Sequence, residues 1–222
     1  MAAERVNKVK EQSAMNAREQ VKIKSTFREY AEAIGMALLL ALFIRTFIVQ
    51  AFKIPSGSMI PTLQIGDHIL VNKLSYGVRM PFLERYLLDF QKPQRGDVVV
   101  FIFPEDRSKD FIKRVIGVAG DSVEIRGKKI SINGKLVDDP YAHFEGDDPQ
   151  APGIVSRDDY GPKTVPDNHI FVMGDNRDRS YDSRFWGYVN LADVRGKAFL
   201  IYWSWDGGDR WVRWERLGGL IR

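Results

Sequence analysis

Two serines in a short segment bounded by prolines are the first residues that could do chemistry. Residues 54–61 read Ile-Pro-Ser-Gly-Ser-Met-Ile-Pro, so Ser56 and Ser58 are two positions apart. Proline fixes the backbone angle φ on either side, and Gly57 allows backbone angles that other residues avoid. Such a turn can present one hydroxyl outward and hold a second beside it. An ordinary Pro/Gly/Ser loop has the same composition, so this segment alone leaves both interpretations open.

A lysine inside an apolar run is the second candidate. Residues 111–116 read Phe-Ile-Lys-Arg-Val-Ile, and strand alternation places Phe111, Lys113 and Val115 on one face. Apolar neighbours would desolvate this amine and lower its pKa. A general base near neutrality needs a fall from about 10.4 to about 7, on the order of 4 kcal/mol. A solvated lysine on an edge strand is the alternative.

A stretch with charges of both signs is the third candidate. Residues 174–184 hold three Asp, three Arg and two Ser directly after an apolar run. Alternating Asp and Arg suit a stiff ion-paired loop, in which a hydroxyl can be aimed at a neighbouring group. A solvated polar loop is the alternative.

Other common catalytic arrangements are missing from the sequence. The three histidines are His68, His143 and His169, and none lies among the Gly/Ser-rich or acidic residues that would suggest a triad base. The nucleophile-elbow pattern G-x-S-x-G is absent as well. Histidines without acidic or cysteine spacing predict no metal site.

The composition is that of a globular protein. The chain has 222 residues, of which 44% are hydrophobic and 28% charged, enough for one or two domains. The formal net charge of +4 is mild, and no basic cluster is interleaved with aromatic residues, so nucleic acid is not an expected partner. The absence of cysteine excludes a disulfide scaffold and a cysteine nucleophile.

An apolar segment near the N-terminus predicts a membrane anchor. Residues 1–30 are polar, with seven basic and four acidic side chains, and residues 33–44 are wholly apolar or small. Extension to Phe52 reaches the length of about 20 residues that spans a bilayer, if Arg45 snorkels toward the headgroups. We expect a cytoplasmic segment at 1–30, a single-pass transmembrane helix at 31–52 and an extracytoplasmic domain at 53–222. A buried helix and a signal peptide cut after Ala51 are the alternatives.

The remainder of the chain is predicted to be mainly β. No helical period occurs between residues 55 and 199, while residues 74–93 and 138–166 are expected to be long loops. Asn133-Gly134 is a strong hairpin signal. We expect an antiparallel sheet or a partly closed, barrel-like domain. Its strands are expected at 67–73, 97–103, 111–118, 122–126, 129–132, 135–137, 169–173 and 197–203.

Four tryptophans follow the last of these strands. Their arginine-rich context fits anchoring at a bilayer surface, where indole lies between apolar and wet surroundings. A terminal strand that packs its indoles into the core is the alternative. They are Trp203, Trp205, Trp211 and Trp214.

Five segments occur in the order and spacing of bacterial type I signal peptidases, also called leader peptidases. They are residues 55–63 (PSGSMIPTL), Gly66-Asp67 with Val71-Asn72-Lys73, 95–101 (RGDVVVF), 111–114 (FIKR) and 174–187 (GDNRDRSYDSRFWG). With the preceding anchor, the chain resembles this family from about residue 33 to residue 203. The resemblance implies a β catalytic domain into which a smaller β subdomain, here residues 120–166, is inserted.

The resemblance also implies a function. Family members are membrane-bound Ser/Lys endopeptidases that cut signal peptides from exported preproteins after Ala-x-Ala, through an acyl-enzyme and without cofactor or metal. The implied location is the bacterial cytoplasmic (inner) membrane, with the catalytic domain on the periplasmic face. Implied partners are signal peptides, the lipid bilayer and the protein translocation machinery.

The resemblance assigns roles to individual residues. Ser58 resembles the nucleophile and Lys113 the general base, while the Ser58 amide and the Ser56 hydroxyl would form the oxyanion hole. Ser180 resembles the hydroxyl that orients the lysine. The supporting ion pairs would be Asp182–Arg184 and Asp175–Arg114, and the substrate-binding residues Ile54, Met59, Phe111 and Ile112. Alternation would place Ile112 opposite Lys113, so its pocket role rests on the resemblance alone.

One position departs from the family pattern. Arg179 stands where the family usually has Asn before the serine. A cation there would lower the pKa of Lys113 further if it pointed inward, and would have no effect if it faced water.

Two rival functions remain open from the residues alone. A self-cleaving Ser/Lys repressor-type protease would need a DNA-binding module where this chain has its apolar segment. A tethered β domain that only binds partners would not need a neutral Lys113.

Overall fold

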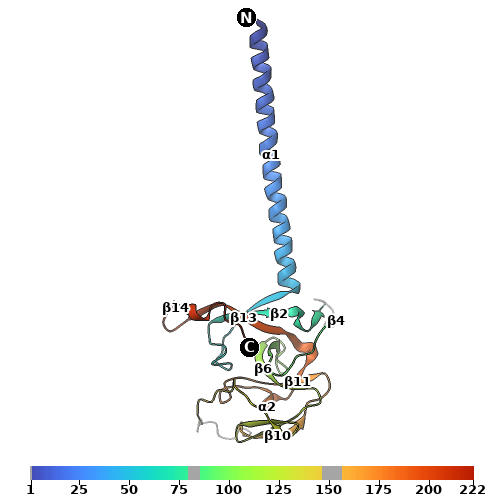
Figure 1. Cartoon of the computed structure of the whole chain (residues 1–222), viewed down its shortest axis with the longest axis vertical. Helices are drawn as coiled ribbons and strands as arrows, with labels where there is room; N and C mark the ends of the chain where they lie inside the picture. The colour runs from blue at the N-terminus through green and yellow to red at the C-terminus, as the bar shows by residue number, and fades with distance from the viewer. Residues whose placement is uncertain (1, 80–85, 147–156) are drawn as a thin grey trace. The chain divides into compact units, whose positions relative to one another are not determined.

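The computed structural model describes residues 2–79, 86–146 and 157–222 (Figure 1). The chain divides into two compact units, Met1–Arg45 and Thr46–Arg222. Parts of the two predicted loops, residues 80–85 and 147–156, lie outside the described residues.

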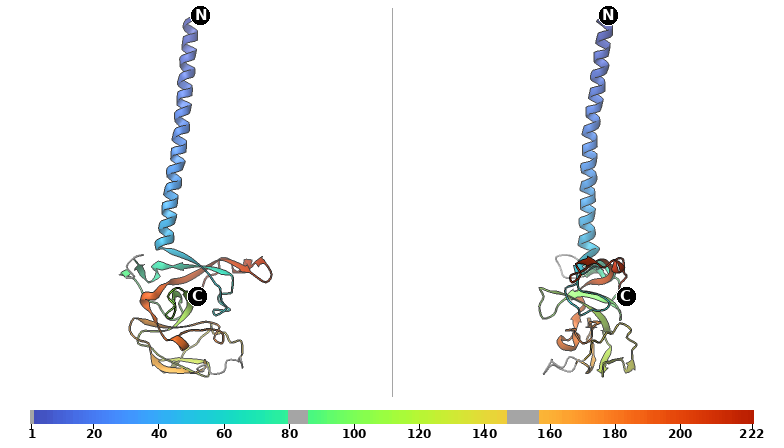
Figure 2. Two further views of the ribbon diagram at one scale, coloured as in Figure 1. Left: turned by 180° about the vertical axis from the view of Figure 1, so that it is seen from behind. Right: turned by 90° about the vertical axis from the view of Figure 1, so that its left-hand side faces the viewer.

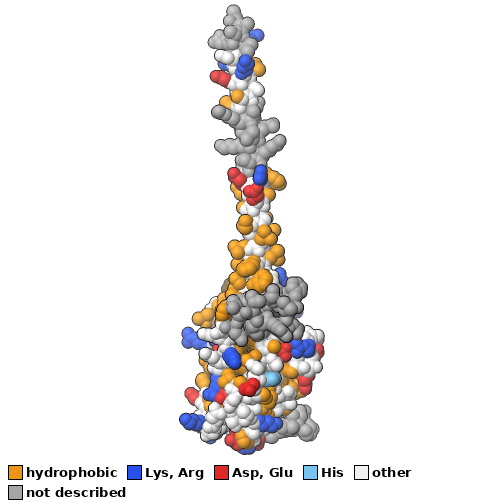
Figure 3. Space-filling model, turned by 90° about the vertical axis from the view of Figure 1, so that its right-hand side faces the viewer, with side chains coloured by type: hydrophobic (Ala, Val, Ile, Leu, Met, Phe, Trp, Pro, Cys, Tyr) orange, Lys and Arg blue, Asp and Glu red, His pale blue; other side chains and the backbone are white. Residues whose placement is uncertain are grey.

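A single long helix, α1 (Ala2–Phe47), precedes the β structure. Its segment Thr26–Phe47 is long and apolar enough to cross a membrane, and Figure 3 shows apolar side chains gathered along this part. The helix ends five residues before the predicted boundary at Phe52, because the next residues form strand β1 (Val49–Lys53). The residues of β1 pair with β2 (Asp67–Asn72), and this pairing satisfies backbone groups that a longer helix would have bonded internally.

An eight-stranded antiparallel sheet forms the centre of the second unit. Its order is β1-β2-β13-β5-β6-β11-β12, with β14 paired to β13. The remaining strands are β5 (Val98–Ile102), β6 (Asp110–Val118), β11 (His169–Met173), β12 (Val189–Asn190), β13 (Val194–Asp206) and β14 (Trp211–Val212). The fold-class prediction of a mainly antiparallel β protein is therefore confirmed, although the strands of the described regions form an open sheet and not a closed barrel.

A smaller sheet holds the residues expected to form the inserted subdomain. Its order is β10-β7-β8-β9, and it lies at the other end of the second unit from β2 (Figure 1, Figure 2). Its strands are β7 (Ser122–Arg126), β8 (Lys129–Ile132), β9 (Lys135–Leu136) and β10 (Tyr160–Thr164). Asn133 and Gly134 both have positive φ, as the predicted hairpin between β8 and β9 requires.

Each of the eight predicted strands is present, and the structure adds elements that showed no period in the sequence. Strand β10 carries a bulge at Gly161-Pro162, so its side chains do not alternate regularly. The other additions are too short to show a period: β12, β14, β3 (Gly77–Arg79), β4 (Tyr86–Asp89), α2 (Ser183–Trp186) and the 3-10 turns Lys73–Ser75, Leu191–Asp193 and Trp214–Arg216.

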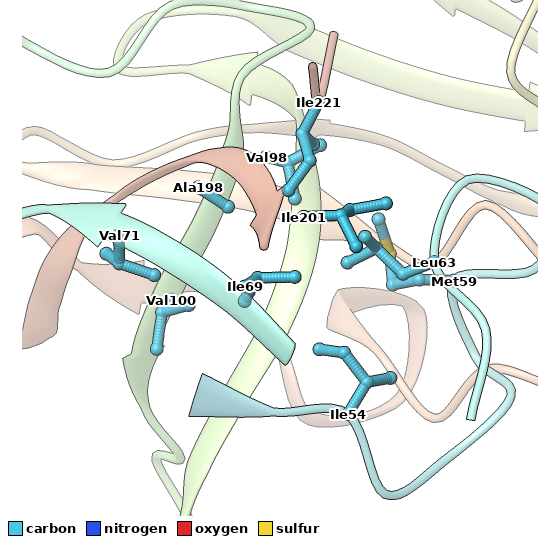
Figure 4. Close-up of a cluster of buried hydrophobic side chains, with 10 residues drawn as sticks. All are labelled: Ile54, Met59, Leu63, Ile69, Val71, Val98, Val100, Ala198, Ile201 and Ile221. Atoms are coloured by element: carbon cyan, nitrogen blue, oxygen red, sulfur yellow. The ribbon is translucent and has the colours of Figure 1, made fainter. Parts of the chain in front are cut away.

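Three buried apolar clusters hold the second unit together. The first lies under β1, β2, β13 and β5, and Figure 4 shows its side chains converging. The second joins the small sheet to β6 and β11, while the third lies against β5, β6, β11 and β12. Strand β6 contributes to the second and third clusters and borders the first, so it is the central strand of this unit.

The four C-terminal tryptophans are not core residues. Their exposed fractions run from 37% for Trp203 to 65% for Trp211. The alternative of a terminal strand with buried indoles is therefore wrong for this chain.

A buried carboxylate fastens this C-terminal segment to β2. Asp67 has no exposed surface and accepts from Arg216 Nη2 at 2.6 Å and from Ser204 Oγ at 2.6 Å, with Arg213 Nη1 at 3.6 Å. Burial alone would raise the pKa of Asp67, but the hydrogen bonds from Arg216, Ser204 and the Gln64 amide outweigh it and lower the pKa.

We predict that Asp67→Ala destabilises the full chain by about 3 to 5 kcal/mol at neutral pH, because it leaves the two arginines without their buried partner. Since the folded-state pKa is lowered, this contribution is complete above about pH 4 and disappears as the pH falls further. Urea unfolding in detergent measures it. The exposed Asp209→Ala is the control, and an equal effect of both changes would contradict the prediction.

Candidate active site

The turn between β1 and β2 carries Ser58. At its base, Ile54 N donates to Asp67 O at 2.8 Å and Gly66 N donates to Ile54 O at 3.0 Å. Met59, next to Ser58, is fully buried in the first cluster (Figure 4). The backbone bonds and this apolar side chain together hold the serine in a fixed place.

Strand β6 brings Lys113 to this serine. Lys113 pairs in register with Val99 of β5, and its Nζ donates to Ser58 Oγ at 2.7 Å and to Ile112 O at 3.0 Å. Only 4% of Lys113 and 8% of Ser58 are exposed. Residues 55 positions apart in sequence therefore form a buried amine–hydroxyl pair.

The surroundings of Lys113 increase the fraction of its neutral form. Burial lowers the pKa of Lys113 to about 8, while the nearby charges of Asp182 and Asp175 act in the opposite direction and raise it. At pH 7 about one amine in ten is then neutral. A neutral amine within hydrogen-bond distance of a hydroxyl can accept its proton, which is the arrangement of an activated nucleophile.

The loop after β11 packs closely on the serine turn at Gly174. A Cβ atom at this position would lie less than 3.0 Å from both Ser58 O and Ser180 Oγ. A side chain at position 174 would therefore prevent this loop from packing against the serine turn. The sequence argument did not single out this glycine, although its place directly after an apolar strand was a usable signal.

Ser180 is buried beside this contact. Its Oγ accepts from Gly174 N at 3.2 Å, and 1% of the residue is exposed. Ser56 lies on the exposed part of the turn, two residues before Ser58. The orienting role of Ser180 and the oxyanion role of Ser56 stay predictions.

Both predicted ion pairs are present. Arg184 Nε and Nη2 each lie 2.9 Å from an oxygen of Asp182, which also accepts from Gly174 N at 3.1 Å. Arg114 binds Asp175 through two bonds of 2.8 and 2.6 Å, with both side chains buried. These pairs fix the backbone of the loop that contacts Ser58.

Two further hydrogen bonds join this loop to the serine turn. Thr62 Oγ1 donates to Asp175 Oδ2 at 2.6 Å, and Asn176 N donates to Ser58 O at 3.1 Å. Asn176 Nδ2 donates to Glu145 Oε1 at 2.6 Å. Thr62 and Asn176 were missed in the sequence because their role depends on partners more than 100 positions away.

The predicted substrate-binding residues divide between the two faces of β6. Ile54 and Met59 are buried in the first cluster, and the half-buried Ile112 packs against them. Phe111 is half-buried and packs against the third cluster. Ile112 therefore lies on the same side as Ile54, and Phe111 on the opposite side. Their contacts with a substrate stay predictions.

Arg179 takes the second of its two predicted orientations. Its side chain is 69% exposed and forms an ion pair with Glu145. It is not among the groups that shift the pKa of Lys113.

Within the described residues, no group of three or more His, Asp or Glu side chains could hold a metal ion.

Comparison with known proteins gives a consistent result. The family model described as "Signal peptidase, peptidase S26" matches residues 27–203. Signal peptidase I of Pseudomonas aeruginosa is 39% identical over 209 residues, which cover 80% of this chain and 72% of that protein. Signal peptidase I of Leptolyngbya laminosa is 38% identical over 200 residues, which cover 86% of each chain. A solved signal peptidase I from Enterococcus faecalis is 34% identical, with a TM-score of 0.39, over 49% of this chain and 98% of that one.

We predict that burial of Lys113 makes the stability of the chain depend on pH. With a folded-state pKa of about 8, the unfolded chain binds one more proton than the folded chain between about pH 8 and 10.4. The free energy of unfolding of the wild type should therefore rise by about 3 kcal/mol across this interval relative to Lys113→Met. Urea unfolding in detergent at both pH values measures the difference.

The exposed Lys135→Met is the control for this experiment and should follow the wild type at both pH values. An unchanged difference between wild type and Lys113→Met at pH 8 and 10.4 would mean that the amine is not desolvated.

Proposed function

The chain belongs to the signal peptidase family, peptidase S26, and is a protease of the signal peptidase I type; from this premise we propose that it cuts signal peptides from exported preproteins with a Ser58–Lys113 dyad. The observation that carries the proposal is the buried 2.7 Å hydrogen bond between Lys113 Nζ and Ser58 Oγ. Family membership excludes the rival of a domain that only binds partners.

The proposed reaction needs one proton carrier. Neutral Lys113 takes the proton of Ser58 Oγ as the oxygen attacks the peptide carbonyl, and the Ser58 amide and Ser56 hydroxyl donate to the oxyanion. The lysine then protonates the leaving amine. Water activated by the same lysine releases the acyl-enzyme and regenerates the serine.

Ser180 and the two ion pairs act as support in this proposal. Ser180 contacts Gly174, and Gly174 in turn contacts the serine turn. In this proposal the Ser180 hydroxyl orients the Lys113 amine. Asp182 and Asp175 hold the loop and temper the fall of the Lys113 pKa, so that the lysine can both accept and return a proton.

Specificity for Ala-x-Ala follows from the apolar side of β6. Ile54 and Met59 leave almost no exposed surface, and Ile112 is half-buried beside them. A site lined in this way admits a methyl group and excludes larger side chains, since a packed core does not yield easily. Phe111 borders the same stretch of β6 from the other face.

We also propose a membrane location. The segment Thr26–Phe47 anchors the chain in the bacterial cytoplasmic membrane, the basic N-terminal residues remain in the cytoplasm, and the β unit lies on the periplasmic face. The exposed tryptophans suit the headgroup layer of the bilayer. The protein translocation machinery would deliver the preproteins.

We predict that Ser58→Ala and Lys113→Ala each lower kcat for preprotein cleavage by on the order of 10⁴-fold or more, because each removes half of the dyad. Ser56→Ala should lower kcat by about 10²- to 10³-fold, as the loss of one oxyanion donor does. Cleavage of a preprotein by the full chain in detergent is the assay.

The exposed Ser108→Ala serves as the control and should cleave at the wild-type rate. Full activity in the Ser58 or Lys113 variant would refute the dyad. Cleavage only of the chain itself would instead favour the self-cleaving rival.

We predict an acid limb in the pH–rate profile. Since the neutral amine is the base and the pKa of Lys113 is lowered to about 8, kcat/KM should fall about tenfold per pH unit below pH 8 and level off above it.

Arg179→Asn should leave this acid limb of the pH–rate profile in place, because the Arg179 side chain faces water and pairs with Glu145. A shift of the limb by half a pH unit or more would show that Arg179 acts on the lysine.

A further inference from the structure

The polar segment 139–146 is bonded to the loop after β11. His143 N donates to Asp175 O at 2.8 Å, and Arg177 N donates to His143 O at 2.8 Å. Asp139 forms an ion pair with Arg177. The segment is therefore fixed against the same loop that contacts the serine turn, although the sequence predicts only a long loop with little to bury.

Glu145 in this segment binds a buried amide. Its Oε1 accepts from Asn176 Nδ2 at 2.6 Å, while its Oε2 forms an ion pair with Arg179 Nε. The Glu145 side chain is 30% exposed, whereas only 1% of Asn176 is exposed. A carboxylate at the surface thus contacts a side chain that lies inside the site.

The Asn176 amide also contacts the serine turn. Its Nδ2 donates to Gly57 O at 3.4 Å, which is a long hydrogen bond, and no described residue donates to its buried Oδ1. A carboxylate only accepts hydrogen bonds, so a flipped amide would place Oδ1 against the Glu145 oxygen. The orientation of the Asn176 amide therefore depends mainly on Glu145.

Gly57 O belongs to the same peptide group as the proposed oxyanion donor, Ser58 N–H. This peptide bond is trans, so its C=O and N–H point in opposite directions. Gly57 O accepts from Ile60 N at 3.2 Å as well as from Asn176 Nδ2. Donors on the oxygen fix the plane of the peptide group and with it the direction of the N–H. Among the described residues, none accepts from Ser58 N, which leaves this N–H for the oxyanion.

We propose that Glu145 is a positioning residue for the cleavage reaction. Its carboxylate fixes the Asn176 amide, and this amide fixes the peptide group that carries Ser58 N–H. A donor stabilises an oxyanion best when it is aligned before the charge develops. Glu145 acts through Asn176 and does not itself touch the substrate. This inference rests on the proposed cleavage by Ser58 and Lys113.

The test measures kcat and KM of the full chain in detergent, at a pH above the Lys113 pKa of about 8. Glu145→Ala should lower kcat for a reference preprotein by about five- to twentyfold, which is part of the loss that removal of an oxyanion donor causes, and leave KM within about twofold. Glu145→Gln should keep about half or more of the wild-type kcat, because its amide oxygen can still accept from Asn176 Nδ2. The acid limb of the pH–rate profile should stay in place in both variants.

Glu124→Ala is the matched control. Glu124 is a glutamate of similar exposure, 34%, that also pairs with an arginine, Arg126, at 3.2 Å, but it lies on β7 of the small sheet. This variant should cleave at the wild-type rate. Asn176→Ala should lose at least as much kcat as Glu145→Ala, and the double variant should lose no more than Asn176→Ala, because the two residues act in series.

Five results would overturn the inference. They are wild-type kcat in Glu145→Ala, a change in KM alone, a shifted acid limb, a Gln variant as slow as the Ala variant, and an equal loss in Glu124→Ala. A further loss in the double variant would contradict it as well. The Glu145 variants alone decide the matter if Asn176→Ala does not fold.

Failure of the proposed function would look different. Ser58→Ala would then still cut the reference preprotein. If only the role of Glu145 were wrong, cleavage would require Ser58 and the Glu145 variants would give one of the contradicting results.

Discussion

The structure depends on one costly arrangement, a lysine amine held out of water against a serine hydroxyl. Desolvation lowers the pKa of Lys113 to about 8, which destabilises the folded chain at neutral pH by about 3 kcal/mol relative to an exposed lysine. The two nearby carboxylates, Asp182 and Asp175, limit this fall. A base that titrates near the working pH can both take and return a proton, so the same burial that weakens the fold suits Lys113 to the proposed proton transfer.

The surrounding residues exclude water from the Ser58–Lys113 pair and hold its two side chains in place. Strand β6 has a buried cluster on each face, and the serine turn is anchored by Met59 in one of them. The loop after β11 closes on the turn through Gly174, where no side chain would fit. Arg114 and Asp175 are ion-paired with almost no exposed surface, so loss of either would leave an uncompensated buried charge. These constraints leave the dyad little freedom to move.

The two faces of β6 contact different apolar clusters. Ile112 packs against the first apolar cluster, together with Ile54. On the other face Phe111 stacks on Phe103, which in turn meets the exposed Tyr181 edge-on. Strand alternation makes this division possible, since neighbouring residues on one strand point to opposite faces. One strand can therefore carry Lys113 and still pack against a different apolar cluster on each face.

Ser58, Lys113 and the main strands could be predicted from the sequence, because the two residues stand in local patterns and alternating runs such as β6 show their period without help from distant residues. It could not locate the end of α1, because apolar residues 47–52 suit a helix and a strand alike, and pairing with β2 decided between them. It could not orient Arg179, whose direction depends on Glu145. The need for Gly174 and the ring contacts of Tyr181 also arise only where distant segments pack together, and such contacts leave no periodic trace in the chain.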